Sequence, residues 1–161
     1  MTSSGSTYPS GGGLPATTFF SKTYDEAQDL VVEAMRYAKY SGEMSQSRQS
    51  QESQSLACSL EGLRLTTRLT QIMAWLLFQR AVHAGELSPE QALTRSNRLG
   101  GQAVCNDRRG EHMMAVPSGL RDLLLRSRKL YQRIARLDEM IARDSLATES
   151  GPLSPQSDPL L

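Results

Sequence analysis

The chain has 161 residues, of which 39% are hydrophobic, and 18 basic residues against 17 acidic ones give it a formal net charge of +1. This size suits one domain with a single core, and the near-zero charge argues against the strongly basic surface that nucleic-acid binders usually carry. The longest apolar run, Ile72 to Phe78, is far shorter than the roughly 20 residues that span a bilayer, and the N-terminus lacks a signal-peptide pattern, so a cytoplasmic protein is expected.

Both ends of the chain have the composition of flexible tails. Residues 1–18 are dominated by Ser, Thr, Gly and Pro, and residues 147–161 repeat that composition with three prolines. Such segments bury too little apolar surface to offset the entropy that is lost when they are ordered. We therefore expect a disordered N-terminal arm, a helical bundle domain over residues 19–146, and a disordered C-terminal tail.

The first element is a helix that is expected to begin at a T-x-x-E capping box formed by Thr23 and Glu26 and to end near Ser41 and Gly42. After the box, apolar residues recur at the spacing of one helix face. They are Ala27, Leu30, Val31, Ala34, Met35 and Ala38. One face of this helix is therefore expected to be buried.

The second helix is expected from about Gln51 to Ala84, where Gly85 supplies the left-handed residue that commonly follows a helix end. On a helical wheel its apolar residues form two arcs. The first arc consists of Leu65, Leu69, Ile72, Met73 and Leu76, and the second of Leu56, Leu60, Leu63, Ala74, Phe78 and Ala81. The central helix of a bundle uses both arcs, each against a neighbouring helix.

A third stripe of this helix lies between the two arcs and mixes polar residues with one tryptophan. It consists of Glu61, Arg64, Arg68, Gln71, Trp75, Gln79 and Val82. Trp and Arg are the residues most enriched among interface hot spots, because each offers a large contact area and directional donors. Two interpretations stay open. Either Trp75 is an ordinary core residue with the arginines over its edge, or the stripe binds a partner protein through Arg64, Arg68, Gln71, Trp75 and Gln79.

A short third helix follows. Ser88, Pro89 and Gln91 have the pattern of its N-cap, first helical residue and capping-box partner, and it is expected to end near Asn97. Residues 98–116 then show no sustained period and contain three glycines, so a long loop is expected there.

Pro117 and Ser118 open the last helix. Its apolar seam alternates three- and four-residue spacing, apart from one closer pair, and consists of Leu120, Leu124, Ser127, Tyr131, Ile134, Leu137 and Ile141. Three long helices with narrow apolar stripes bury them only against one another. The expected fold class is therefore all-α, as an antiparallel helical bundle of three long helices with one short connecting helix.

The last helix also carries a basic set, which only Asp122 opposes before Asp138. The set consists of Arg121, Arg126, Arg128, Lys129, Arg133 and Arg136. A solvated exterior is the ordinary interpretation. The functional interpretation is an acidic protein partner that contacts residues such as Arg126 and Arg133. Nucleic acid is a weaker candidate, because no recognition motif and few aromatic residues accompany the basic set.

The sequence lacks the motifs of the common enzyme classes. His83 and His112 have no cysteine or carboxylate neighbours at metal-ligand spacing, and no phosphate-binding glycine loop, G-x-S-x-G or H-E-x-x-H motif is present. Cys58 and Cys105 form no Cys-x-x-Cys pair, so reduced thiols are expected. We therefore expect a protein that is not an enzyme, uses no metal or cofactor, and acts by binding other macromolecules.

One block in the centre of the chain is more specific than these general patterns. The run RLTTRL at residues 64–69 is followed by Gln71, by WLL at residues 75–77, by QRAV at residues 79–82 and by AGE at residues 84–86. In this order of polar and apolar residues the chain resembles the RcdA family of bacterial regulators of CtrA degradation. The flanking segments FFSKTYDEAQDLVVEA and VPSGLRDLLLRSRKLYQRIARLDE are also similar, so the likeness covers roughly residues 19–140.

The resemblance implies a helical-bundle homodimer that is not itself an enzyme. Members of this family act as adaptors for the ATP-dependent protease ClpXP, and they work with the receiver-domain protein CpdR to tether cell-cycle regulators for destruction. The partners implied are therefore a second copy of the chain, ClpXP with a CpdR-like receiver protein, and a protein cargo. The alternatives are a helical nucleic-acid-binding regulator that uses its basic last helix, and a purely structural helical dimer.

Overall fold

The computed structural model of the protein describes residues 13–45 and 52–149, and over these residues it contains helices and connecting turns but no strand. The long helices are α1 (Gly13–Ser45), α2 (Glu52–His83) and α6 (Ser118–Glu149). Three single-turn helices, α3 (Pro89–Ala92), α4 (Gln102–Cys105) and α5 (Arg109–His112), lie between α2 and α6 in the sequence. The predicted all-α bundle of three long helices is confirmed.

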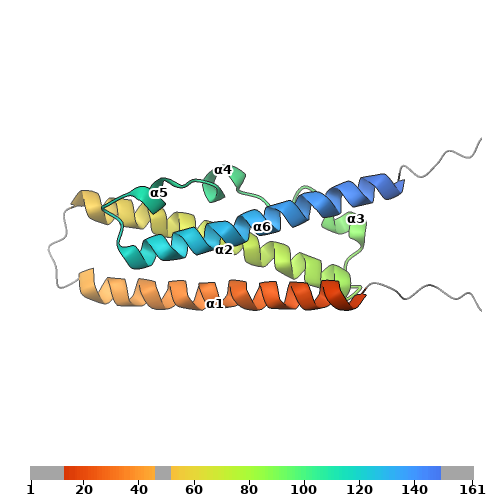
Figure 1. Ribbon diagram of the computed structural model, residues 1–161, viewed down its shortest axis with the longest axis horizontal. Coiled ribbons are helices and arrows are strands. Elements are labelled where there is room, and N and C mark those ends of the chain that lie inside the picture. The colour runs from red at the N-terminus through yellow and green to blue at the C-terminus, as the bar shows by residue number, and fades with distance from the viewer. Residues whose placement is uncertain (1–12, 46–51, 150–161) are drawn as a thin grey trace, which may run out of the picture.

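Helix α1 runs antiparallel to α6 and lies along the other two long helices (Figure 1). Arg126 in the first half of α6 binds Glu33 in the second half of α1. Arg133, further along α6, binds Glu26, which comes earlier in α1. Because contacts move backwards along α1 as they move forwards along α6, the two helices point in opposite directions.

Helices α2 and α6, in contrast, run in the same direction. Arg68 of α2 donates a hydrogen bond to the Leu124 carbonyl of α6, and Trp75 donates to Asp138, so the contacts advance together along both helices. The antiparallel arrangement expected from the sequence therefore applies to α1 against its neighbours but not to this pair. Residues 84–117, here called the crossover, return the chain along the bundle and make the parallel arrangement possible.

Helix α1 begins at Gly13, ten positions before the predicted capping box. Thr23 is buried inside the helix, where its Oγ1 donates a 2.9 Å hydrogen bond to the Phe19 carbonyl, so the predicted cap is wrong. Pro15 lies in the first turn, where a missing N–H breaks no helical bond. The boundary expected after residue 18 therefore lies within α1. The rest of the expected arm, residues 1–12, is outside the described residues.

The other end of the expected domain also lies inside a helix. Helix α6 begins at Ser118 as predicted and continues to Glu149, past the expected boundary after residue 146. Residues 150–161 of the expected tail are outside the described residues. The regular part of the chain is therefore longer at both ends than composition alone indicated.

The elements around the crossover agree with the local capping signals. Helix α2 has the expected bounds, and Gly85 after it has a φ of 74°. In the capping box of α3, Ser88 Oγ accepts from the Gln91 N–H at 3.2 Å, and Gln91 Oε1 accepts from the Ser88 N–H at 2.9 Å. However, α3 ends at Ala92, earlier than predicted, and the expected long loop contains α4 and α5.

The core lies where the apolar faces of the three long helices meet. The predicted seam of α6 is buried at Leu120, Leu124, Ser127, Tyr131 and Ile134. It packs with the first arc of α2, of which Leu65, Leu69, Ile72 and Leu76 are buried, and with Ala27 and Leu30 of α1. The sequence therefore predicted the main packing faces of the bundle correctly.

Candidate protein-interaction site

The polar stripe of α2 faces the interior of the molecule. Trp75 is 1% exposed, the Arg68 side chain is fully buried, and Glu61 and Gln79 are also buried. The crossover and α6 cover the stripe, since Arg68 binds both of these segments and Trp75 binds α6. These residues are therefore packed inside the fold and are not accessible to a partner in this structure. This agrees with the interpretation of Trp75 as a core residue.

Arg68 binds both the crossover and α6. Its Nε donates to the Cys105 carbonyl at 2.8 Å, and Nη2 donates to the Asp107 carbonyl at 3.2 Å. Its Nη1 donates to the Leu124 carbonyl at 2.7 Å and to Ser127 Oγ at 3.0 Å. Burial lowers the pKa of this guanidinium, because a charged group loses water hydration inside the bundle. The hydrogen bonds compensate for that loss and fix the crossover in place.

Trp75 takes part in a second contact between segments. Its indole N–H donates to Asp138 Oδ1 at 2.8 Å, and the other oxygen of Asp138 accepts from the Arg98 Nε at 2.9 Å. The ring of Phe20 from α1 lies 6.0 Å from the Trp75 ring, centre to centre. A residue predicted as a possible binding hot spot is therefore surrounded by α1, α6 and the crossover.

Gln71 holds the crossover close to α2. Its Oε1 accepts a 3.1 Å hydrogen bond from the Gly100 N–H, and a Cβ added at Gly100 would lie only 2.9 Å from the same oxygen. A side chain at Gly100 would therefore displace the Gln71 amide from this position. Tyr131 of α6 donates from its hydroxyl to the Gly100 carbonyl at 2.7 Å, and burial raises the pKa of Tyr131 to about 12. Both polar backbone groups of Gly100 are thus satisfied by side chains of the bundle.

Arg64 binds the crossover at its surface edge. Its Nη2 lies 3.2 Å from Asp107 Oδ2, and the same guanidinium pairs with Glu61. Asp107 also accepts hydrogen bonds from the side chain and the backbone N–H of Arg109, and these hydrogen bonds lower the pKa of Asp107 to about 2. Arg64 is therefore paired within the chain, and Arg68, the other arginine of the stripe, is hydrogen-bonded within it.

The basic residues of α6 that were expected to meet an acidic partner are partly paired with α1. Arg126 binds Glu33 at 2.9 Å and Asp122 at 3.0 Å, and Arg133 binds Glu26. The Arg126 and Arg133 side chains remain 43% and 42% exposed, so they are accessible from solvent. Surface ion pairs of this kind are weak and exchange readily with other partners.

The second arc of α2 lies outside the core, which differs from the expectation that each arc packs on a neighbouring helix. Leu56, Leu60 and Leu63 are between 53% and 66% exposed. On α1, Met35 and Tyr40 are similarly exposed at 67% and 62%. Contiguous exposed apolar side chains are uncommon on monomers and usually mark a surface that binds another macromolecule.

Leu56, Leu63, Met35 and Tyr40 line a groove of about 1880 Å³ between the second half of α1 and α2, where its lining runs from Glu52 to Leu77. Its walls are mostly apolar or small side chains, with Gln54 and two tyrosines, and Glu52 is the one charged residue that lines it among those described. The α2 wall contains small residues at three- and four-residue spacing, namely Ser55, Ser59, Gly62, Thr66, Thr70 and Ala74. This row of small residues is visible in the sequence and could have indicated a helix-packing surface there, since small side chains between leucines allow a second helix to approach closely.

The structure offers little that resembles a catalytic or metal centre. Among the described residues, no group of three or more His, Cys, Asp or Glu is arranged to hold a metal ion. The His83 ring packs against Phe20, with ring centres 4.9 Å apart, and Cys58 and Cys105 are free thiols. Within the same part of the chain, no helix has both the length and the apolar character that crossing a bilayer requires.

Comparisons with known proteins identify relatives of the chain. Residues 14–160 match the family described as "Protein of unknown function (DUF1465)". A search of curated proteins gives no match. Among solved structures, the crystal structure of RcdA from Caulobacter crescentus CB15 is similar, with 35% sequence identity and a TM-score of 0.58. The similarity covers 76% of this chain and 89% of the Caulobacter chain.

Proposed function

This chain belongs to the RcdA family, and from that membership we propose that it acts as an adaptor in regulated proteolysis. It promotes degradation of cell-cycle transcriptional regulators of the CtrA type by ClpXP, together with a CpdR-like receiver protein. The observation that carries the proposal is the 35% identity to RcdA over 89% of that chain. In this role the protein is not an enzyme, and it works by holding other proteins together.

The physical requirements of an adaptor agree with the surfaces of the molecule. Tethering a cargo beside a protease raises its local concentration to about the millimolar range when the connection is short. Each separate contact of the adaptor then needs only modest affinity. Exposed, accessible surfaces such as the groove and the basic edge of α6 suit contacts of this kind better than buried pockets do.

We assign the groove between α1 and α2 to a second copy of the chain. In a two-fold interface both subunits contribute the same surface, so a surface with one sign of charge would face a surface of the same sign and be repelled by it. The groove avoids this penalty because the described residues that line it are neutral apart from Glu52. Its exposed leucines, including Leu56 and Leu63, supply the apolar area that a dimer buries.

Arg126 and Arg133 are assigned to contacts with an acidic protein partner. Both side chains reach solvent, and both already bind carboxylates of α1 in the isolated chain. A partner carboxylate of similar geometry would replace or share these pairs at small cost. The buried stripe residues Arg64, Arg68, Gln71, Trp75 and Gln79 support this surface indirectly, since they hold α6 and the crossover on α2.

The proposal is tested by reconstituted degradation. Purified ClpXP, a CpdR-like receiver protein and a CtrA-type cargo are incubated with and without this protein, and loss of cargo is followed over time. We expect faster degradation with the protein than without it, and slower degradation when Leu63→Asp disrupts the groove. No acceleration for any candidate cargo, with every component present and active on a control substrate, would contradict the adaptor function.

A further inference from the structure

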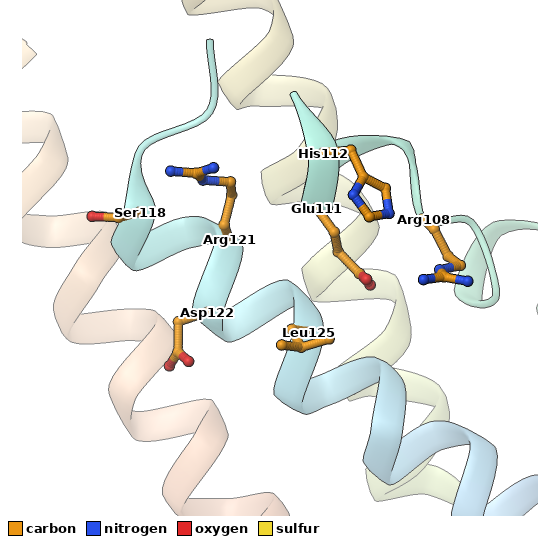
Figure 2. Close-up of a pocket in the computed structure, with 7 residues that line it drawn as sticks. All are labelled: Arg108, Glu111, His112, Ser118, Arg121, Asp122 and Leu125. Carbon is orange, nitrogen blue, oxygen red and sulfur yellow. The ribbon is translucent and has the colours of Figure 1, made fainter. Parts of the chain in front are cut away.

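A small cavity of about 290 Å³ lies between α5 and the first turns of α6 (Figure 2). It is lined by Arg108, Glu111, His112, Ser118, Arg121, Asp122 and Leu125. In Figure 2, Arg121 and Arg108 stand on opposite sides, with Glu111 and Leu125 between them. The cavity therefore has two separated cationic groups, with the apolar side chain of Leu125 and the carboxylate of Glu111 between them.

The two carboxylates of this cavity are already neutralised by other residues. Glu111 accepts hydrogen bonds from Nε and Nη2 of Arg128, at 2.5 and 2.9 Å. Asp122 accepts from Nη1 of Arg126 at 3.0 Å. Neither carboxylate therefore offsets the charge of the cationic side chains on the two sides of the cavity.

Arg108 and Arg121 themselves have no side-chain hydrogen bond or ion pair with any residue in the described parts of the chain. The Nε of Arg121 is buried without an acceptor, and an unsatisfied buried donor is costly. Lys129, four residues after Leu125 on α6, is exposed and extends the cationic edge by one helical turn. The cavity thus carries uncompensated positive charge on a molecule whose formal net charge is only +1.

We propose that this cavity binds an extended acidic segment of a protein partner, with an apolar side chain on Leu125 and flanking carboxylates on Arg108 and Arg121. Guanidinium groups bind carboxylates through paired N–H donors, which suits both arginines. Because the two arginines stand apart, a segment with separated carboxylates matches them better than one small anion does. The inference rests on the proposed function only in taking the ligand to be part of a protein.

Nucleic acid fits the cavity less well. A phosphate backbone carries closely spaced negative charges, whereas the two arginines stand on opposite sides of a cavity that Glu111 and Asp122 also line (Figure 2). A peptide can place its carboxylates beside the arginines and its uncharged groups beside those acids. The observed mixture of charges therefore favours a peptide.

Fluorescence anisotropy of the full chain tests the proposal directly. The probe is a short labelled peptide in which glutamates flank one leucine, and it is titrated with wild-type protein at low ionic strength. Comparison peptides carry lysines in place of the glutamates, or serine in place of the leucine. We expect the acidic peptide to bind and the lysine peptide not to bind. The serine peptide should bind at least about threefold more weakly than the acidic peptide that carries leucine.

Variants then place the binding on the two arginines. Arg108→Gln and Arg121→Gln are each expected to weaken binding by about threefold, and the double variant by about tenfold. Arg95→Gln is the matched control, since Arg95 follows α3 and α3 lies at the other end of the bundle from α5 (Figure 1). Arg108 is exposed, so its replacement tests the site without risk to folding, and thermal melting checks the Arg121 variant.

Three results would overturn the inference. They are equal binding of the acidic and lysine peptides, unchanged affinity of the double variant, and tighter binding of a single-stranded oligonucleotide than of the acidic peptide at physiological salt. Because no protease is present, this assay is independent of the adaptor function. Peptide binding without any effect on ClpXP degradation would contradict the proposed function alone.

Discussion

The indole N–H of Trp75 donates a 2.8 Å hydrogen bond to Oδ1 of Asp138, a residue that follows it by 63 positions in the chain. The second oxygen of Asp138 binds Arg98 of the crossover. One buried carboxylate therefore joins α2, α6 and the crossover. Trp75, the residue with the strongest sequence signature of a binding hot spot, stabilises the monomer in this arrangement.

Truncation of Trp75 should therefore damage folding. Trp75→Ala is expected to lower the free energy of unfolding by about 3 to 5 kcal/mol, because it leaves a large cavity and removes a donor from Asp138. Trp75→Phe keeps most of the volume and should cost less. Urea denaturation followed by circular dichroism measures both. Met140→Ala, at a side chain that is 51% exposed, is the control and should change stability by less than about 0.5 kcal/mol. A stable Trp75→Ala monomer would return this residue to the binding interpretation.

Replacement of Arg68 should loosen the crossover. Arg68→Ala removes the Arg68 donor from the carbonyls of Cys105 and Asp107 and one of the donors to the Leu124 carbonyl, and a cost of about 3 to 5 kcal/mol is expected. Arg68→Lys retains a charge but not the planar fork of donors, so it should recover only part of that loss. Amide hydrogen exchange over residues 100–112 should accelerate in both variants. Unchanged exchange there would mean that Arg68 does not hold this segment.

The groove between α1 and α2 should determine the oligomeric state. Leu63→Asp places a charge on a side chain that is 66% exposed in the chain, so the monomer should still fold while the proposed dimer should dissociate. Leu146→Asp makes the same chemical change at a side chain that is 64% exposed and does not line the groove. Sedimentation velocity should find the first variant monomeric and the second dimeric. Equal sedimentation of both variants would rule out the groove as the dimer interface.

The charge of Asp107 should make the crossover sensitive to acid. Hydrogen bonds from Arg109 lower the pKa of Asp107 to about 2 from its ordinary 3.8, so the ionised form stabilises the folded state. This stabilisation is fully present above the ordinary pKa and is lost as the pH falls through about 2. Asp107→Asn should therefore cost about 1 kcal/mol at neutral pH. The difference between the variant and wild type should shrink below about pH 4, and a difference independent of pH would contradict this assignment.

The exposed ion pairs of α6 should matter more for partners than for folding. Arg126→Gln with Arg133→Gln removes two surface pairs with α1, for an expected total loss of about 1 kcal/mol or less. In the reconstituted degradation assay, the same double variant should slow cargo loss by about threefold or more if an acidic partner uses these residues. Equal degradation rates with variant and wild type would remove Arg126 and Arg133 from the proposed surface.

Local signals in the sequence were sufficient for much of the fold. The seam of α6, the end of α2 at Gly85 and the capping box of α3 all depend on neighbouring residues, and all are present in the structure. The capping box at Thr23 failed for an equally local reason. A threonine in the middle of a helix donates to a carbonyl one turn earlier, so the same residue type has two compatible roles.

The assignment of faces on α2 required information that the sequence pattern does not contain. Its two apolar arcs and its polar stripe have similar helical spacing, and only the path of the crossover decides which of them is covered. That path depends on contacts between distant residues, such as Gln71 with Gly100 and Arg68 with Cys105. The sequence pattern therefore leaves the stripe as a candidate binding surface. It also predicts that the arc at Leu56 and Leu63 packs within the chain, whereas the structure exposes it.

The parallel course of α2 and α6 also affects the order in which the chain folds during synthesis. The hairpin of α1 and α2 is complete once His83 has left the ribosome, but Trp75 must wait for α6 to find its acceptor, and Arg68 must wait for α6 to find two of its four acceptors. Until then the side of α2 that packs against α6 is open to water, and it can pair wrongly with another nascent chain. We therefore expect chaperones to bind the unfinished polypeptide at α2 and to be released as α6 emerges.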